Sequence, residues 1–340
     1  MPDRDSESYR LRFILEAQEH CDHFLTPLAD PGGRSVLVLG CGAGSEMLWA
    51  LRHGAREVVG IDLADQSPQA LSEAAARFAV GDRPWSIERL GVEEATRLGR
   101  KFDLVLSNNV LEHLADLDAA FAAAAELVEP TTGSVAVFTS PLYYSSRGSH
   151  LPTRPWEHLV ADPGELGEQL RRELPSEHPL QRMELERYLF EEITLNRARP
   201  LDMLAAAWRS GLVVLNLQLL VDDRIQELPA LRSTLESRAP AAQAADLATR
   251  GLGLELLRLG EALPAHAHRS TAERRAAAGA EVVRQQMARL EEEVRTARGE
   301  MWKAREETEE LRSAFRQVLS SRSYRLGRLL TSPIRMLRSL

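Results

Sequence analysis

Short apolar runs alternate with helical patterns through the first half of the chain. This alternation is typical of a parallel sheet whose strands are joined by crossover helices. The predicted strands are Ser35–Leu39, Val58–Asp62, Ser86–Leu90, Leu104–Asn108 and Ser134–Ser140. The helices between them are predicted to begin near Gly44, Pro68, Glu93 and Asp116. The alanine-rich run 116–128 is a good crossover helix, because its larger apolar residues fall on or near one face.

After Ser140 the pattern loosens into PLYYSSRGSHLPTRPWEHL, a stretch rich in serine, arginine, proline and histidine that predicts a long loop. Loops at the carboxyl ends of parallel strands usually shape a substrate site. Helical segments at Gly164–Leu174 and Gln181–Thr194 would complete an insertion over residues 141–200. The pattern then predicts a helix at Pro200–Ser210 and strands at Leu212–Val221 and Leu252–Leu259.

The globular pattern ends after residue 262, and residues 263–275 are predicted to be a linker. Residues 276–319 carry a heptad repeat, which is a coiled-coil signature. Its flanking charges favour a parallel over an antiparallel homodimer, and a single helix packed on its own domain is the alternative. In a parallel pair the facing residues would be Glu293 with Arg298, Glu300 with Arg305, and Glu307 with Arg312. Residues 320–340 form a basic amphipathic tail that suits an anionic membrane surface.

The formal net charge is −8, so the chain lacks the overall basic character expected of a nucleic-acid partner. Its two cysteines, Cys21 and Cys41, are too few for a disulfide framework or a zinc site. No apolar run reaches the ~20 residues that span a bilayer, and the polar start MPDRDSESYR has no signal-peptide core. We therefore expect a cytoplasmic protein, with peripheral contact at the inner face of the membrane through its tail.

The strongest local motif is SVLVLGCGAGSE, in which a buried strand leads into Gly40, Gly42 and Gly44 and then into a helix. Glycines there allow a sharp turn and close approach to a ligand. The next predicted strand ends in Asp62, where a carboxylate can accept hydrogen bonds from ribose hydroxyls. The pair indicates a nucleoside ligand rather than a tight turn alone. Ser45 stands where a dinucleotide site has its third glycine or alanine, which weakens that alternative.

The segments VLVLGCGAG, VVGIDLA, FDLVLSNNVLEHLAD and GSVAVFTSP resemble class I S-adenosylmethionine-dependent methyltransferases, in order and spacing, over roughly residues 34–260. The resemblance implies an α/β fold, a Rossmann-like, mainly parallel seven-stranded sheet with an antiparallel closing strand, over residues 1–262. It also implies S-adenosylmethionine as the methyl donor. The implied cofactor-binding residues are Gly40, Gly42, Gly44, Asp62, Leu63, Glu93 and Asn108.

Two positions depart from the family pattern. Members usually have an acid at the position of Val38 and an aspartate at the position of Val92, where the adenine amino group is bound. Glu93 or Glu94 could supply that adenine contact through a shifted loop. The departures keep open a different class of function, a catalytically degenerate cofactor-binding domain that serves as a coiled-coil scaffold.

A hydroxyl acceptor usually needs a base, and histidine suits that role near neutral pH. The candidates are His150, His158 and His113, each with a structural role as the alternative. The segment GSHLPTRPWEHL resembles methyltransferases of bacterial surface-glycan synthesis, which makes His150 the first candidate, with Trp156 and His158 shaping the acceptor pocket. Some related methyltransferases hold a metal with an acidic ligand at the position of Asn109. Because this residue is an asparagine, no metal is expected.

The resulting hypothesis is O-methylation of a sugar or glycan intermediate in cell-surface polysaccharide synthesis, with glycan-assembly enzymes as further partners. The ending SSRSYRLGRLLTSPIRMLR supports it through a short resemblance to the tails of bacterial polysaccharide glycosyltransferases and methyltransferases. A small lipid or quinone-like acceptor is the alternative within the same class. A dinucleotide oxidoreductase comes third.

Overall fold

The computed structural model describes residues 6–64, 68–151, 153–173, 195–239 and 242–258. The predicted linker, coiled coil and basic tail lie outside the described residues, as does the predicted helix at 181–194. The homodimer and the tail contact therefore stay predictions, and so do the boundaries of the C-terminal segments.

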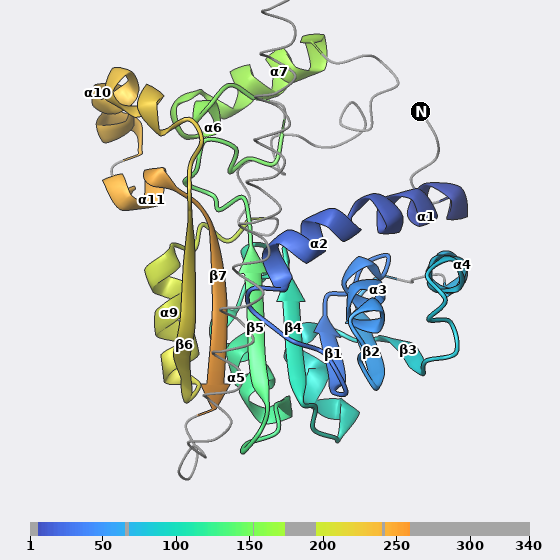
Figure 1. The fold of residues 1–340 in the computed structure, drawn as a ribbon. Coiled ribbons are helices and arrows are strands. Elements are labelled where there is room, and N and C mark those ends of the chain that lie inside the picture. Colours follow the sequence, from blue (N-terminus) through green and yellow to red (C-terminus); the bar gives the residue numbers. More distant parts are fainter. Residues whose placement is uncertain (1–5, 65–67, 152, 174–194, 240–241, 259–340) are drawn as a thin grey trace, which may run out of the picture. The chain divides into compact units, whose positions relative to one another are not determined.

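The described residues form one seven-stranded sheet, in the order β3-β2-β1-β4-β5-β7-β6 (Figure 1). Its first five strands pair in parallel, whereas β7 runs antiparallel between β5 and β6. The predicted Rossmann-like sheet with one antiparallel closing strand is confirmed. The strands are β1 (Ser35–Leu39), β2 (Glu57–Asp62), β3 (Trp85–Arg89), β4 (Leu104–Asn108), β5 (Ser134–Thr139), β6 (Leu212–Val221) and β7 (Thr249–Arg258).

Helices cover both faces of this sheet, and others gather beyond the carboxyl ends of the parallel strands (Figure 1). One face packs against α1 (Glu7–Glu16), α2 (Gln18–Leu25), α3 (Ser45–Arg52) and α4 (Pro68–Arg77). The other packs against the 3₁₀ helix η1 (Val92–Leu98), α5 (Leu117–Leu127) and α9 (Pro200–Arg209). Beyond the strand ends lie α6 (Glu157–Val160), α7 (Pro163–Glu173), α10 (Leu228–Arg238) and α11 (Ala244–Ala248). Two short 3₁₀ helices, η2 (Leu111–His113) and η4 (Ile225–Glu227), join the remaining segments.

Strand β1 shows why its sequence is apolar without a break. Val36 and Val38 pack toward α2 and α3, while Leu37 and Leu39 pack toward α5. Successive side chains of a strand point to opposite faces, so a strand covered on both faces must be apolar throughout. All five residues of β1 are buried, which places the glycine-rich turn at the edge of a rigid core.

Four elements differ from the sequence prediction in kind, start or presence. The helix expected near Glu93 is the 3₁₀ helix η1, in which Val92 and Ala95 are buried because residues three apart share one face of a 3₁₀ helix. Strand β7 begins three residues earlier than expected, because Gly251 and Gly253 weaken the strand signal at that end. The N-terminal helices α1 and α2 were not predicted from the hydrophobic pattern. Within the described ranges, none of the helices is long and apolar enough to cross a membrane.

Candidate functional site

The glycine-rich turn after β1 adopts backbone conformations that favour glycine. Gly40 has φ +66°, and a Cβ there would lie 2.5 Å from Val110 Cγ2. Gly42 has φ +49°, and a Cβ there would meet nothing within 4 Å. Gly40 is therefore required for packing, whereas Gly42 leaves open space beside the backbone. Residues 40–46, which we call the cofactor loop, then enter α3 through Gly44 at its N-cap.

Asp62, at the end of β2, holds the cofactor loop in place. Its Oδ2 accepts a hydrogen bond of 2.8 Å from the Gly42 N–H, and its Oδ1 accepts one of 2.8 Å from the Ala64 N–H. Each carboxylate oxygen can accept a second hydrogen bond, so the predicted contact with ribose hydroxyls is still available. The carboxylate thus has a loop-fixing role that the sequence analysis did not assign.

A cavity of about 520 Å³ lies against the cofactor loop, within the ~300–1,000 Å³ typical of small-molecule sites. Gly40, Gly42, Glu46 and Asn108 line it from the sheet side. Helices α1 and α2 line it as well, with Phe13, Glu16, Ala17, His20 and Cys21. The structure therefore brings the predicted Gly40, Gly42 and Asn108 together and adds a helical wall that the sequence analysis missed.

The cavity contains a carboxylate and an amide that fit a cationic ligand. Glu46 Oε1 accepts a hydrogen bond of 2.6 Å from Asn108 Nδ2. This contact fixes the amide so that Asn108 Oδ1, which is buried, has no hydrogen-bond partner within the described structure. Burial raises the pKa of Glu46, and the hydrogen bond from Asn108 opposes that shift. An ammonium group would supply the missing donor to Oδ1 and the positive charge that a partly buried carboxylate favours.

The predicted adenine contacts converge at Gly91. A Cβ built there would lie 3.3 Å from Leu63 Cδ2 and 3.6 Å from Glu93 Oε2. Leu63 is 70% exposed, which leaves its apolar side chain open to a planar ring. Val92 itself is buried in the core, so an acid on the exposed side of η1 is better placed for a polar contact than residue 92.

Residues 141–158, the acceptor loop, are held by two ring N–H groups. Trp156 Nε1 donates to the Tyr144 carbonyl at 3.1 Å, and His158 Nε2 donates to the Tyr143 carbonyl at 2.7 Å. Both rings are buried, and burial lowers the pKa of His158 to about 4. His158 is therefore neutral at physiological pH. It lines neither the cavity beside the cofactor loop nor the second cavity, which His150 lines.

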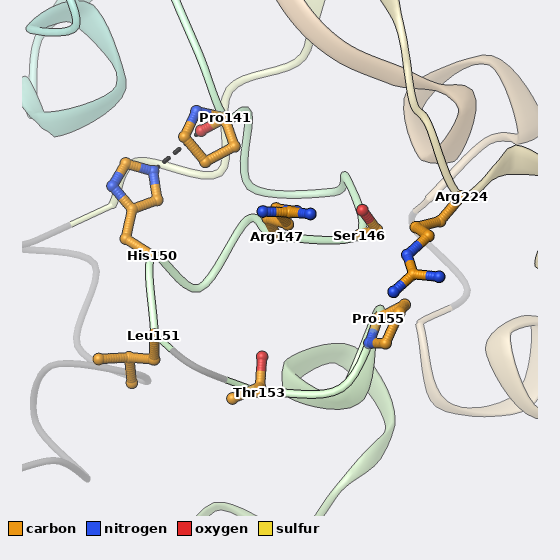
Figure 2. Close-up of a pocket in the computed structure, with 8 residues that line it drawn as sticks. All are labelled: Pro141, Ser146, Arg147, His150, Leu151, Thr153, Pro155 and Arg224. Atoms are coloured by element: carbon orange, nitrogen blue, oxygen red, sulfur yellow. Dashed lines mark hydrogen bonds between the residues drawn. The ribbon is translucent and has the colours of Figure 1, made fainter. Parts of the chain in front are cut away.

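His150 lies differently, at the wall of a second cavity between the acceptor loop and the segment after β6 (Figure 2). Its Nε2 donates to the Pro141 carbonyl at 2.9 Å, which leaves Nδ1 as the ring acceptor. Burial lowers the pKa of His150, while the bond to Pro141 opposes the shift. The exposed ring of His113 lies 5.2 Å from it, centroid to centroid. Two of the three predicted histidines are thus adjacent.

The peptide at Ser140–Pro141 connects the two cavities. Asn109 lines the first cavity, and its Oδ1 accepts a hydrogen bond of 3.0 Å from the Ser140 N–H. Pro141 lines the second and binds His150. Nearby, the buried Glu112 of the LEH motif accepts a hydrogen bond of 2.6 Å from Thr139 Oγ1. These contacts fix the ends of β4 and β5 relative to each other.

Glu46, Glu112 and the arginines of the second cavity were not predicted from the sequence. Glu46 is only two residues beyond Gly44, so its position beside the loop was a usable signal. The other positions depend on contacts between distant segments. Among the residues that the structure describes, no group of three or more histidine, cysteine, aspartate or glutamate side chains could hold a metal ion.

Residues 13–215, more than half of the chain, match the model of a family described as a methyltransferase domain. The chain therefore belongs to this family. The match confirms the predicted enzyme class, an S-adenosylmethionine-dependent methyltransferase.

Curated relatives match shorter segments. A tRNA U34 carboxymethyltransferase of Shewanella piezotolerans is 42% identical over 91 residues, 26% of each chain. A ubiquinone biosynthesis O-methyltransferase of Neisseria meningitidis is 38% identical over 103 residues, 30% of this chain and 42% of that protein. The chain spans about a quarter of the length of the first of these relatives. A solved S-adenosylmethionine-dependent methyltransferase from Mesorhizobium loti is 20% identical with a TM-score of 0.42, over 75% of this chain and 99% of that one.

Proposed function

We propose that the protein transfers a methyl group from S-adenosylmethionine to a hydroxyl of a sugar or glycan intermediate in cell-surface polysaccharide synthesis. The observation that supports this best is the adjacency of the two cavities. One has a glycine-rich wall and a carboxylate–amide pair, and the other has a histidine whose Nε2 is held by the Pro141 carbonyl. A donor site and an acceptor site would then meet at the carboxyl edge of the sheet, where ligands of open α/β sheets bind.

The cofactor would lie in the cavity beside the cofactor loop. Asp62 would hold its ribose, Leu63 and Glu93 its adenine, and Asn108 with Glu46 its amino-acid ammonium group. Glu46 would thereby supply the carboxylate that the family resemblance expects at position 38. S-adenosylmethionine supplies a methyl group bonded to a positively charged sulfur, which needs no further activation.

The chain's own contribution to transfer would be alignment and proton removal. Holding donor and acceptor in line is a large part of catalysis for a reaction of this kind. As the bond between acceptor oxygen and methyl carbon forms and the bond between sulfur and carbon breaks, His150 Nδ1 would take the hydroxyl proton. The Pro141 carbonyl would hold the tautomer that makes this possible.

Calorimetric titration of the full chain with S-adenosylhomocysteine and with NAD tests the donor. We expect micromolar binding of the former and none of the latter. Binding of NAD alone would overturn the proposal in favour of an oxidoreductase, and binding of neither ligand would favour the degenerate scaffold. The E46Q variant should bind S-adenosylhomocysteine more weakly, while E73Q, which changes an exposed glutamate of α4 outside the cavity, serves as the matched control.

A second acceptor class is favoured by one observation, the similarity to a ubiquinone biosynthesis O-methyltransferase. Mass spectrometry of surface glycan and of lipid extracts, from cells with and without the protein, distinguishes the two. Loss of one methyl group from a glycan supports the proposal, and loss from a quinone or lipid replaces it.

A further inference from the structure

The second cavity, about 450 Å³ in volume, contains two arginines that the methyl-transfer scheme does not use. Arg147 comes from the acceptor loop and Arg224 from the segment after β6, far apart in the sequence. Figure 2 shows Arg147 between His150 and Ser146, and Arg224 across the cavity beside Pro155.

A buried aspartate holds the two arginine-bearing segments together. Asp222, 1% exposed, accepts a hydrogen bond of 2.8 Å from the Ser146 N–H and one of 2.9 Å from the Arg224 N–H. Its own N–H donates to the Ala248 carbonyl. The negative charge of Asp222 is therefore used on backbone groups, and the arginine positions are fixed by the fold rather than by chance surface contact.

Both guanidinium groups keep donors for a ligand. Arg147 pairs with Asp223 at 3.6 Å with its side chain 64% exposed, and Arg224 pairs with Glu227 at 2.9 Å with its side chain 49% exposed. Arg250 also approaches Asp223, at 3.7 Å. Exposed pairs of this kind contribute little to stability, so a ligand with a higher charge can displace them. Each guanidinium carries five N–H donors.

Hydroxyl groups complete the cavity. The Ser146 side chain lines it and is 1% exposed, and its Oγ is buried without a hydrogen-bond partner in the described structure. Thr153 lies opposite, with its hydroxyl directed into the space below Arg147 (Figure 2). A buried hydroxyl with no partner is unfavourable unless a ligand supplies one.

We propose that this cavity binds the phosphate groups of the methyl acceptor, and specifically a diphosphate. Two guanidiniums on separate segments, with hydroxyl donors between them, match two linked phosphoryl groups better than one planar carboxylate, which a single arginine can hold. The inference rests on the proposed function, because it assigns the second cavity to the acceptor. It adds that the acceptor hydroxyl is carried on a diphosphate-linked molecule.

The orientation of His150 agrees with an acceptor whose phosphates bind the arginines while its hydroxyl lies at the base. Figure 2 shows its Nε2 directed to Pro141 and its other ring nitrogen facing away from Arg147. The arginines would hold the charged end of the acceptor while the far side of the ring faces the hydroxyl. One molecule would then contact both the anchoring groups and the base.

Titration of the full chain with inorganic pyrophosphate, in the presence of S-adenosylhomocysteine, tests the inference. The variants are R147Q, R224Q and the double substitution. R232Q is the matched control, because Arg232 also pairs with a glutamate on an exposed surface but lies on α10, outside the cavity. Arginines of the C-terminal tail contribute the same background to the parent and to all four variants.

We expect each single variant to bind pyrophosphate at least about tenfold more weakly than the parent, since a charged hydrogen bond contributes ~1.5–3 kcal/mol. The double variant should retain only the background, and R232Q should match the parent. Equal affinity in the parent and the double variant would overturn the inference. If all variants still bind S-adenosylhomocysteine, that result leaves the proposed function standing, whereas a parent that fails to bind S-adenosylhomocysteine refutes the function itself.

Two sources of a diphosphate remain to be separated, a nucleotide and a polyprenyl lipid. Uridine diphosphate and farnesyl diphosphate carry the same charged group on different organic parts. The one that binds more tightly than pyrophosphate, with the same dependence on Arg147 and Arg224, identifies the source. If neither binds more weakly in the double variant than in the parent, the diphosphate assignment is wrong.

Discussion

The cofactor loop and the acceptor loop meet at the same edge of the sheet but are held in different ways. The cofactor loop is fixed locally, by glycines with positive φ and by Asp62 on the adjacent strand. The acceptor loop is fixed by side chains and by distant strands, since Asp222 binds Ser146 and the Arg250 carbonyl accepts from the Leu142 N–H. Donor binding and acceptor binding should therefore respond to separate substitutions.

The largest expected effect is a loss of turnover on substitution of His150, with cofactor binding unchanged. Replacing His150 with alanine removes the proposed base, and general-base catalysis contributes typically ~10²–10⁴-fold. We expect turnover, measured as release of S-adenosylhomocysteine with the identified acceptor, to fall by that factor. The dissociation constant of S-adenosylhomocysteine should stay within about twofold, because His150 lies outside the first cavity. The H23A variant, which changes an exposed histidine of α2, is the control. Full turnover in H150A would remove this residue from the mechanism.

The next effect concerns the stability of the acceptor loop at low pH. Burial lowers the pKa of His158 from 6.5 to about 4, so between these values the unfolded chain binds a proton that the folded chain does not. The stability contribution is complete above pH 6.5 and is lost as pH falls toward 4. It amounts to about 3 kcal/mol over that window.

Urea unfolding at a series of pH values measures this dependence. The H158Q variant keeps a donor for the Tyr143 carbonyl but cannot take up a proton, so it should lose that part of the pH slope. H23Q should keep it. Identical slopes for the parent and H158Q would show that the ring is not held neutral by the fold.

The position of the cofactor loop could be predicted from the sequence because the loop is held by local interactions. Gly40 and Gly42 take their conformation from their own φ angles, and Asp62 ends a strand that pairs directly with β1. The order of strands and the long apolar runs followed from the same local rules. The position of α9 was predicted as well, because Pro200 and Gly211 mark its two ends.

The acceptor loop shows why the rest could not be predicted. Arg147 and Arg224 meet only because Asp222 joins their segments, and no periodicity relates residues so far apart in the sequence. The burial of Trp156 and His158 depends on the carbonyls of Tyr143 and Tyr144, which a pattern of polar letters does not reveal. The motif PWEHL indicated a functional segment. The sequence alone did not show whether its tryptophan and histidine pack in the interior or contact the acceptor.

A matched pair of glycine substitutions sharpens the comparison further. A Cβ at Gly148 would lie 1.9 Å from the Tyr143 carbonyl oxygen, so G148A forces the acceptor loop to move. We expect about 2–3 kcal/mol lower stability in urea unfolding, with S-adenosylhomocysteine affinity little changed. G42A meets no atom within 4 Å and should cost only ~1–2 kcal/mol for its positive φ, yet it should weaken cofactor binding. If each substitution lowered both the stability and the cofactor affinity to a similar extent, the two loops would be one cooperative unit.

The smallest expected effect tests whether Asp62 acts on the ligand or only on the loop. D62N keeps the shape but leaves one oxygen to serve both the Gly42 and Ala64 N–H groups and the ribose. Hydrogen bonds to a charged acceptor contribute ~1.5–3 kcal/mol, so affinity for S-adenosylhomocysteine should fall by about ten- to a hundredfold. Part of that loss could come from a loosened loop, and D62N should therefore also lower the unfolding midpoint slightly. Titration with methylthioadenosine, which keeps the ribose and lacks the amino-acid group, separates the two causes. If Asp62 binds the ribose, D62N weakens both ligands by the same factor; if it only positions Gly42 beside the amino-acid group, methylthioadenosine affinity is unchanged.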